Sequence, residues 1–353
     1  MKTFLQFQKG IQSIPMTASW HLSDLGEARG KQELFTRQSP QKLKVLREHA
    51  LIESAVSSNR IEGVEIDHKR IGTVLFGKSL LHDRDEEEIR GYRNALQLIH
   101  NQGARLRLDS DLVCRLHALT RGGAGDAGQF KTRESHIVEK YPDGRQRIRF
   151  QTVSASETPQ AVIELIALWH QCLEERWVHP LIAMAAFNLD FLCIHPFRDG
   201  NGRVSRLLFL LQCYQLGYEV GRYISLERII EQNKERYYET LEASSQQWHQ
   251  GHHDPWPVIQ FFLFVLKTAY REFEHRFEQA SAPKGSKTEL IELVIRAVSD
   301  TFTITDLERA APGVSRDMIR AVLKRLKNDG QVVCRGRGPG ARWSAVSQKQ
   351  PKE

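Results

Sequence analysis

Apolar residues recur every three or four positions along most of the chain, and this spacing predicts a mainly α-helical protein. Residues 180–194 are apolar almost throughout, so the helix expected there should be buried on all sides. The helices expected from the spacing span residues 41–63, 158–176, 180–194, 203–217, 225–247 and 256–279. Residues 67–120 also favour helices, and Asp109 or Ser110 is the expected N-cap of one of them.

A hairpin is expected ahead of the apolar helix. Residues 135–140 and 145–152 are runs that favour β-strands, and they flank Tyr-Pro-Asp-Gly, a sequence typical of a turn. Without another observation, such a hairpin is an ordinary surface feature.

Two further segments are interpreted from their polarity. Residues 1–40 are mixed and interrupted by glycine, which predicts short ordered pieces laid on the core rather than a domain. The apolar residues expected to make that contact are Trp20, Leu22, Leu25 and Leu34. The charged residues of 83–100 are expected on a solvated helix face, opposite an inward-facing apolar stripe. This stripe consists of Ile89, Tyr92, Leu96 and Ile99.

The composition fits a folded protein of more than one domain. The chain of 353 residues exceeds one typical domain, and 41% hydrophobic residues allow a substantial core. Its five cysteines are odd in number and form no CxxC pair, which favours a reduced compartment and a cytoplasmic location. No signal peptide is expected, because residues 1–10 lack a sustained apolar segment. No membrane span is expected either, because no apolar run reaches roughly eighteen residues.

The C-terminal segment differs from the rest in charge. Residues 285–353 contain thirteen Lys or Arg against eight Asp or Glu, so they hold five of the seven net positive charges. They follow a linker rich in Ala, Ser, Pro and Gly. Three helices and a basic hairpin are expected in this segment, an order that resembles a winged helix-turn-helix.

The third of these helices is expected to begin after Ser315. Its buried stripe would consist of Ile319, Val322, Leu323 and Leu326. The basic side chains that would face DNA are Arg316, Arg320 and Lys324 on this helix and Arg337 on the hairpin. Winged helices also bind proteins, and basic helix faces are often only solvated, so these alternatives stay open beside DNA.

The densest group of polar side chains lies at residues 195–206, in a loop that leads into a helix. Gly200 and Gly202 allow the backbone there to form a concave nest of N–H groups, and helix N-termini bind anions. Arg203 and Arg206 are three residues apart, so both guanidinium groups lie on one face and can bind phosphate oxygens.

The same loop offers a metal ligand and a base. Asp199 supplies hard oxygen ligands that suit Mg²⁺ bound jointly with phosphates. His195 can act as a general base near neutral pH. Together with the anion nest and the arginines, these residues predict a phosphoryl-type transfer site.

This loop resembles the motif HxFx(D/E)GNGRxxR of the Fic family at every fixed position. The matching residues are His195, Phe197, Asp199, Gly200, Asn201, Gly202, Arg203 and Arg206. Fic enzymes mostly transfer AMP from ATP to a protein hydroxyl, so the resemblance implies ATP as substrate and Mg²⁺ as cofactor. It implies His195 as the base, Asp199 as the Mg²⁺ ligand, and Asn201 with the glycine backbone as the cradle of the α- and β-phosphates. The arginines would bind the outer phosphates.

A second motif lies earlier in the chain. Ser58, Glu62 and Gly63 resemble the inhibitory motif (S/T)xxxE(G/N) that some Fic proteins carry ahead of their core. In those proteins the Glu pairs with the second motif arginine, here Arg206, and blocks the outer phosphate of ATP. The alternative is a solvated helix end.

The resemblance also gives the hairpin and two tyrosines a role. The hairpin corresponds to the Fic flap, which binds a target by adding it as a strand. Its candidate docking residues are Ile137, Val138, Ile148, Arg149 and Phe150. Tyr237 and Tyr238 lie near the place where family members close the nucleotide pocket, although paired aromatic residues also occur in cores.

The expected architecture is a Fic helical core with a β-hairpin flap and a C-terminal winged helix. Its expected domains are a helical region at 1–110, which includes an inhibitory helix at about 41–63, a catalytic core at 111–280, and the linker and winged helix at 281–353. The leading hypothesis is an autoinhibited adenylyltransferase that acts on another protein or on itself. The alternatives are a DNA-binding transcriptional regulator with the Fic core as sensor or scaffold, and a Fic enzyme that removes AMP. A homodimer also stays open.

Overall fold

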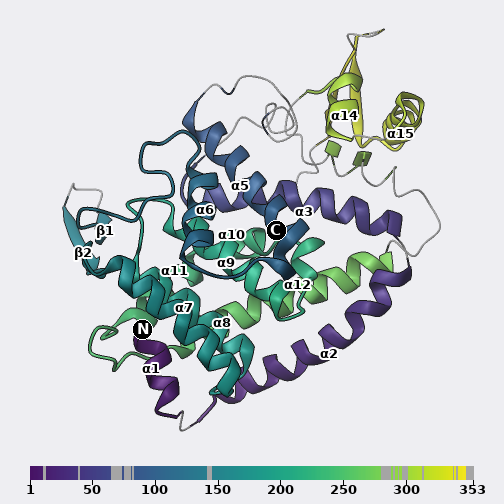
Figure 1. Cartoon of the computed structure of the whole chain (residues 1–353). Helices are drawn as coiled ribbons and strands as arrows, with labels where there is room; N and C mark the ends of the chain where they lie inside the picture. Colours follow the sequence, from purple (N-terminus) through teal and green to yellow (C-terminus); the bar gives the residue numbers. More distant parts are fainter. Residues whose placement is uncertain are drawn as a thin grey trace.

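The computed structural model describes residues 1–10, 13–38, 40–64, 74, 81, 83–140, 145–279, 288, 291–292, 294–295, 301–311, 314–336, 338 and 341–346. The protein is mainly α-helical, as predicted, with two short antiparallel hairpins among the described residues (Figure 1). None of the helices described is long and apolar enough to span a bilayer.

The first helices are α1 (Lys2–Gln8), α2 (Met16–Gln38), α3 (Pro40–Ile61), α5 (Arg84–Gln102), η1 (Gly103–Arg105) and α6 (Ser110–Arg121). The hairpin strands β1 (Ile137–Lys140) and β2 (Gln146–Phe150) follow, at the place predicted for a hairpin. The next helices are α7 (Thr158–Glu175), α8 (Pro180–Ile194), α9 (Asn201–Gln215), η2 (Val220–Arg222), α10 (Leu226–Gln232), α11 (Lys234–Ser245) and α12 (Trp256–Gln279). The C-terminal elements are α14 (Ile304–Ala310), α15 (Arg316–Asn328), β3 (Val332–Arg335) and β4 (Arg342–Ala345).

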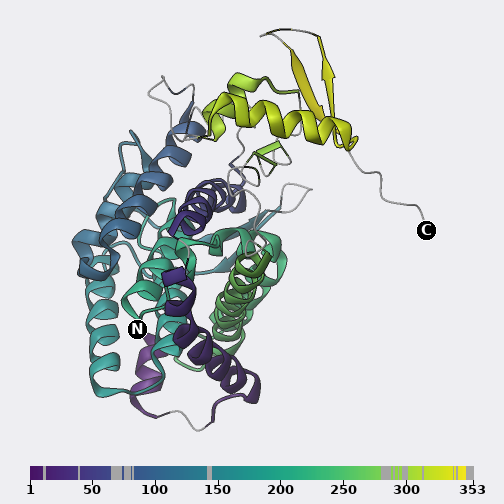
Figure 2. The ribbon, with the colours of Figure 1, turned by 90° about the vertical axis from the view of Figure 1, so that its right-hand side faces the viewer.

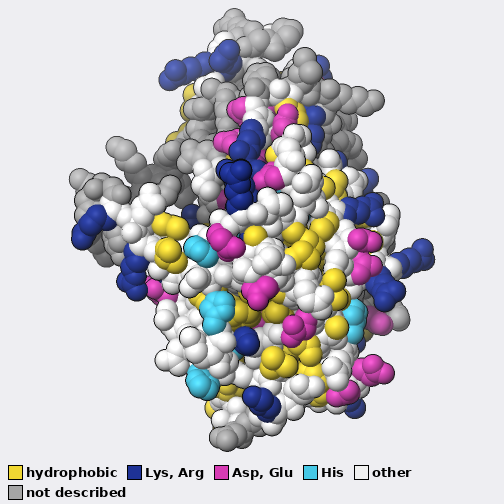
Figure 3. Space-filling model, turned by 60° about the vertical axis from the view of Figure 1, so that its left-hand side comes forward, with side chains coloured by type: hydrophobic (Ala, Val, Ile, Leu, Met, Phe, Trp, Pro, Cys, Tyr) yellow, Lys and Arg dark blue, Asp and Glu magenta, His cyan; other side chains and the backbone are white. Residues whose placement is uncertain are grey.

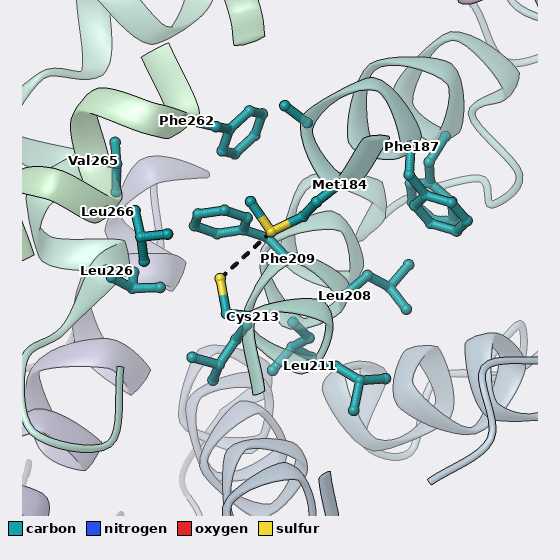
Figure 4. Packing of buried hydrophobic residues seen from close by; sticks show 14 of the residues in the cluster. Met184, Phe187, Leu208, Phe209, Leu211, Cys213, Leu226, Phe262, Val265 and Leu266 are labelled. Carbon is teal, nitrogen blue, oxygen red and sulfur yellow. Dashed lines mark hydrogen bonds between the residues drawn. The ribbon is translucent and has the colours of Figure 1, made fainter. Parts of the chain in front are cut away.

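Helix α8 lies at the centre of the hydrophobic core. Every one of its residues except Pro180 and Leu192 is buried, because the helix is apolar on all sides and packs against α7, α9 and α12. Figure 4 shows Met184 of α8 beside Phe209 and Cys213 of α9, with the Met184 and Cys213 sulfur atoms 3.6 Å apart. This packing fixes the C-terminal end of α8, which leads into the loop at residues 195–200.

A buried polar network sets how α9 lies against α8. Asn188 on α8 donates to Gln212 Oε1 on α9 (3.1 Å) and accepts from the Ser205 hydroxyl (2.9 Å). Asn188, Ser205 and Gln212 are all fully buried. Because buried polar groups are costly without partners, other registers of the two helices are disfavoured.

The first forty residues differ from the short pieces expected. Helix α2 has 23 residues and lies beside α12, as Figures 1 and 2 show. Of the apolar side chains described in this helix, Ala18 and Leu25 are fully buried, whereas Trp20 and Leu34 are 64% and 62% exposed. The expected contacts of Trp20 and Leu34 are therefore wrong, because a helix on the surface buries only the narrow face toward its neighbours.

Helix α1 is anchored through a buried carboxylate. Asp190 of α8 accepts hydrogen bonds from the Thr3 hydroxyl and from Trp248 Nε1, each at 2.6 Å. Phe4 and Phe7 of α1 are buried in the same core as α8. The start of the chain is thus packed into the helical body and is no separate domain, as expected.

Two other helical predictions need correction. The apolar stripe from Ile89 to Ile99 is buried as predicted, but Glu86 and Glu88, expected on a solvated face, are also buried. The single helix expected at 225–247 is two helices, α10 and α11. They separate at Asn233, where the backbone leaves helical geometry (φ −119°, ψ 32°) and the side-chain amide donates to the Ile229 carbonyl.

The C-terminal elements, at the yellow end of the colour bar in Figure 2, have a hydrophobic cluster of their own. Helix α15 buries Ile319, Val322, Leu323 and Leu326, the stripe that its spacing predicted. Ser315 caps α15 as expected, and Thr303 caps α14 in a reciprocal bond with Asp306. The linker at 281–287, the hairpin turn at 141–144, most of the helix expected at 289–300, and Arg337 lie outside the described residues.

Candidate active site

The motif loop begins where α8 ends. His195 is the C-cap of α8 and has a left-handed backbone (φ 54°, ψ 63°), which few residues other than glycine adopt. Its N–H still bonds to the Phe191 carbonyl (3.0 Å), so the turn follows the last helical bond directly. Gly200, also left-handed (φ 83°), is the N-cap of α9, and this conformation favours glycine there.

Asn201 holds the loop closed. Its side chain accepts from the Phe197 N–H (2.9 Å) and donates to the Phe197 carbonyl (2.7 Å). Phe197 is buried and stacks on His117, with ring centroids 3.8 Å apart. His117 Nε2 bonds to the Asp199 carbonyl (3.0 Å), and Nδ1 accepts from the Gly128 N–H (2.9 Å). The Asn201 amide is thus engaged within the loop, and its backbone N–H is the group left for a phosphate.

A pocket of about 210 Å³ opens beside this loop. The predicted site residues that line it are Glu62, Ile137, Arg149, Phe150, His195, Gly202, Arg206, Tyr237 and Tyr238. Predicted residues that are absent from its lining are Ser58, Gly63, Val138, Ile148, Asp199, Gly200, Asn201 and Arg203. The other lining residues of the pocket could not be predicted from the sequence. They are Leu189, Leu192, Cys193, Leu241 and Ser245.

His195 is neutral at physiological pH. Burial, and then the charge of Lys131, lowers its pKa to about 4. Its Nδ1 atom is buried and has no hydrogen-bond partner in the part of the chain described. A neutral imidazole facing a pocket can accept a proton from a bound hydroxyl.

Lys131 is a site residue that the sequence did not reveal. Its buried ammonium donates to the Ile194 carbonyl (3.1 Å) and to the Thr152 hydroxyl (2.9 Å). Burial lowers its pKa to about 8. Lys131 thereby joins the end of α8, next to His195, to the base of the hairpin. A single Lys among polar neighbours carries no sequence pattern that distinguishes it from a surface residue.

Arg206 is buried and bound to the end of α3. It donates through Nε to the Ser58 hydroxyl (2.9 Å) and through Nη2 to the Ser58 carbonyl (2.9 Å) and Glu62 Oε1 (2.7 Å). Burial alone would lower its pKa, but the Glu62 carboxylate and nearby tyrosines raise that pKa above its ordinary value. Its Nη1 is buried without a hydrogen-bond partner among the described residues.

Gly202 allows Glu62 to approach this closely. A Cβ atom at position 202 would lie 2.3 Å from Glu62 Oε1, which no side chain could tolerate without a shift of the carboxylate. Tyr238 closes the same side of the pocket, and its hydroxyl donates to the Ile61 carbonyl (3.4 Å). Burial raises the pKa of Tyr238 to about 12, so its hydroxyl stays protonated.

Arg203 and Asp199 are bound to other charged residues. Arg203 donates from Nη1 to the Glu88 carboxylate (2.5 Å), and it is buried. Asp199 Oδ2 accepts from Arg121 (2.7 Å) and Arg84 (3.1 Å), and its side chain is 51% exposed. Burial would raise the pKa of Asp199, but Arg121 and Arg203 hold it below the ordinary value.

The residues at Asp199 fit a Mg²⁺ ion only in part. An ionised, half-exposed carboxylate is a suitable ligand when substrate phosphates complete the coordination shell. No cluster of three or more His, Cys, Asp or Glu that could hold a metal occurs among the residues described. Asp199 would therefore bind Mg²⁺ together with a nucleotide and after release of an arginine.

Three of the four basic residues predicted to face DNA lie on α15. Arg316, Arg320 and Lys324 are exposed, beside the buried stripe. Two of them have acidic neighbours, Glu308 at 3.5 Å from Arg316 and Asp317 at 3.2 Å from Arg320.

Comparison with known proteins identifies the domain around the loop. Residues 107–213 match the sequence model of the Fic/DOC family, so the chain contains a Fic/DOC domain and the resemblance of the motif is confirmed. The fold is similar to a Fic family protein from Desulfovibrio desulfuricans G20, with 22% identity, a TM-score of 0.61, and 97% of this chain and 99% of that chain covered.

Two further solved structures have a similar fold. A Fic domain containing signaling protein from Bacteroides thetaiotaomicron VPI-5482 has 18% identity and a TM-score of 0.61, over 74% of this chain and 99% of that one. Fic-1 from C. elegans has 17% identity and a TM-score of 0.60, over 76% of each chain. At these identities the likeness concerns the fold.

Proposed function

We propose that the protein is an autoinhibited adenylyltransferase, which transfers AMP from MgATP to a Ser, Thr or Tyr hydroxyl of a protein. Fic domain proteins are commonly transferases that act on proteins. The observation that carries the proposal is one pocket lined by the neutral His195, the buried cation Arg206 and the Glu62 carboxylate bound to that cation.

In the proposed reaction, His195 accepts the proton of the target hydroxyl. The hydroxyl oxygen attacks the α-phosphorus, the bond from that phosphorus to the α,β-bridging oxygen breaks, and pyrophosphate leaves. The backbone N–H groups at Gly200–Gly202 and the guanidinium of Arg206 stabilise the negative charge of the phosphates. Mg²⁺, held by Asp199 and the phosphates, would supply further charge neutralisation.

The position of the hairpin beside the pocket supports a protein as the acceptor of AMP. Ile137, Arg149 and Phe150 line the pocket, while Val138 and Ile148 are 40% and 57% exposed. A target segment paired with this hairpin would lie beside His195. Such pairing uses main-chain atoms and suits many sequences.

Glu62 would act as the inhibitor. Its carboxylate occupies the guanidinium of Arg206, the group expected to bind the outer phosphates of ATP. ATP would therefore bind without its productive phosphate contacts until Glu62 is displaced.

The position of the label in ATP tests which group is transferred to protein. We expect label from α-labelled ATP, and none from γ-labelled ATP, to remain on protein, because AMP is the transferred group. The readout is autoradiography of the denatured protein after incubation with Mg²⁺ and a cell extract, and EDTA is the control. Retention of γ-label would indicate phosphorylation instead. Loss of label from a protein modified beforehand, without any gain, would favour the enzyme that removes AMP.

A second candidate function concerns the C-terminal elements. We propose that they bind DNA, because α15 exposes Arg320 and Lys324 beside its buried stripe. On the face of the molecule in Figure 3, by contrast, basic and acidic side chains lie interspersed.

We expect the whole chain to bind a random duplex DNA more weakly at about 200 mM than at about 50 mM salt, because phosphate contacts release counterions. The double variant Arg320→Ala, Lys324→Ala should reduce the slope of log affinity against log salt by about 2. The matched control replaces Arg105 and Arg107, two exposed arginines near α6. Equal slopes for both double variants in a fluorescence anisotropy titration would contradict DNA contact by α15.

A further inference from the structure

Glu88 is a buried carboxylate that binds three arginines. Its Oε1 accepts from Arg84 Nε (2.9 Å) and Arg121 Nη1 (2.7 Å), and its Oε2 accepts from Arg203 Nη1 (2.5 Å). Only 4% of the Glu88 side chain is exposed. These contacts join α5, which carries Glu88 and Arg84, to the end of α6 and the start of α9.

The same three arginines are the cationic neighbours of Asp199. Arg121 Nη1 and Arg84 Nη2 donate to Asp199 Oδ2 at 2.7 and 3.1 Å, and Arg203 Nη2 lies 3.6 Å from Oδ1. Among the described residues, every ion pair of Asp199 is thus made with an arginine that also binds Glu88. The two carboxylates share their partners, so a change at Glu88 must alter the charge around Asp199.

The cluster is balanced in charge. Arg121 also contacts Asp126 (3.3 Å), so three arginines face three carboxylates. Arg121 and Arg203 are 5% and 2% exposed, whereas Arg84 is 58% exposed. Arg84 is therefore the partner that can leave Asp199 for solvent when another cation arrives.

We propose that Glu88 is a positioning residue for metal–nucleotide binding. It neutralises and holds the three arginines, and Asp199 thereby keeps enough negative charge to bind the divalent cation of the substrate. This inference rests on the proposed function, which supplies the metal–nucleotide. Without the Glu88 charge, the arginines would be compensated by Asp199 and Asp126 alone, and an approaching dication would meet a net positive cluster.

Two variants with opposite expected effects on Mn²⁺ affinity test the inference. Both are made in Glu62→Gly protein and titrated with Mn²⁺ in the presence of α,β-methylene ATP, with bound Mn²⁺ measured by electron paramagnetic resonance. Glu88→Gln should weaken Mn²⁺ binding by about tenfold or more, because the cluster gains a positive charge. Arg84→Gln should strengthen Mn²⁺ binding, because it removes a cation that competes for Asp199 Oδ2.

Glu227→Gln is the matched control for burial. Glu227 is 1% exposed and accepts hydrogen bonds from Tyr92 and Ser54, but it contacts none of the cluster. Its replacement should lower the melting temperature, as should that of Glu88, and leave Mn²⁺ affinity unchanged. A folded Glu88→Gln protein with the Mn²⁺ affinity of its parent would overturn the inference. Should that variant not fold, an unchanged affinity of Arg84→Gln would overturn it too.

The parent protein separates this inference from the function on which it rests. If Glu62→Gly protein binds no Mn²⁺–nucleotide at all, the proposed function fails and the inference falls with it. If the parent binds and the variants do not differ from it, only the role of Glu88 is refuted.

Discussion

Glycine in place of Glu62 should raise the transfer of α-label to protein by roughly tenfold to hundredfold. The Glu62 carboxylate bonds to Arg206 at 2.7 Å, and hydrogen bonds to charged groups contribute about 1.5–3 kcal/mol. Its removal frees the guanidinium for the outer phosphates of ATP. Arg206 Nη1, which has no hydrogen-bond partner in the described chain, would gain one at the same time.

The measurement is the initial rate of label incorporation at a fixed ATP concentration. Glu48→Gly is the matched control, because Glu48 lies on the same helix α3 but lines a different pocket. It should disturb the helix to a similar degree without releasing Arg206. Equal rates for the wild type and Glu62→Gly, with both proteins folded, would refute inhibition by Glu62.

Alanine in place of His195 should reduce the rate of Glu62→Gly protein by about 10²–10⁴, the usual contribution of a general base. His195 lines the pocket beside Arg206, and its lowered pKa keeps it in the proton-accepting form. His170→Ala is the control, since His170 bonds to the Leu108 carbonyl and is absent from the pocket lining. A His195→Ala protein with full activity would exclude this residue as the base.

The pH profile gives a second readout of His195. The pKa of about 4 lies below the ordinary value, so the imidazole is neutral through the physiological range and the rate should not fall until the pH approaches that value. The folded protein binds this proton less readily than the unfolded chain does. His195 therefore lowers stability as the pH falls from its ordinary pKa of 6.5 toward 4, and His195→Ala should lessen this loss in thermal melts.

The motif loop was the most predictable part of the site because its residues are contiguous. Glycines at positions 200 and 202, taken together with the ionisable residues of 195–206 and the helix after them, predict an anion nest. The contact between Glu62 and Arg206 was different, because these residues are 144 positions apart and no spacing joins them. Only the resemblance to a family motif gave that pair.

Glu88 shows why other site residues could not be predicted. It follows several acidic residues, and such a run is usually solvated. Its burial depends on Arg121 and Arg203, which are 33 and 115 residues away and belong to other helices. A buried charge is stable only with partners, and the sequence does not show which partners the fold brings. Lys131 could not be predicted for the same reason, because its partners Thr152 and Ile194 are distant in the sequence.

The helix boundaries illustrate the same limit on a smaller scale. The apolar spacing located α8 at the residues expected, because burial on all sides leaves a continuous apolar run. The spacing continued through Asn233, so it could not reveal the break between α10 and α11. That break depends on a side-chain bond of Asn233 to the backbone, which competes locally with the helix.

In the proposed inhibition, the Glu62 carboxylate belongs to the same chain as Arg206, so dilution cannot release it. Ser54 on α3 bonds to Ser225 and Glu227, at 2.9 and 2.7 Å, and these bonds hold the helix that carries Glu62 in place. A ligand fixed in this way has an effective concentration on the order of millimolar or above. ATP would need the same guanidinium and would therefore compete with the Glu62 carboxylate. The local concentration of that carboxylate does not change with the amount of protein in the cell. Under this proposal, a signal that loosens α3 would release Arg206 without any change in the ATP supply.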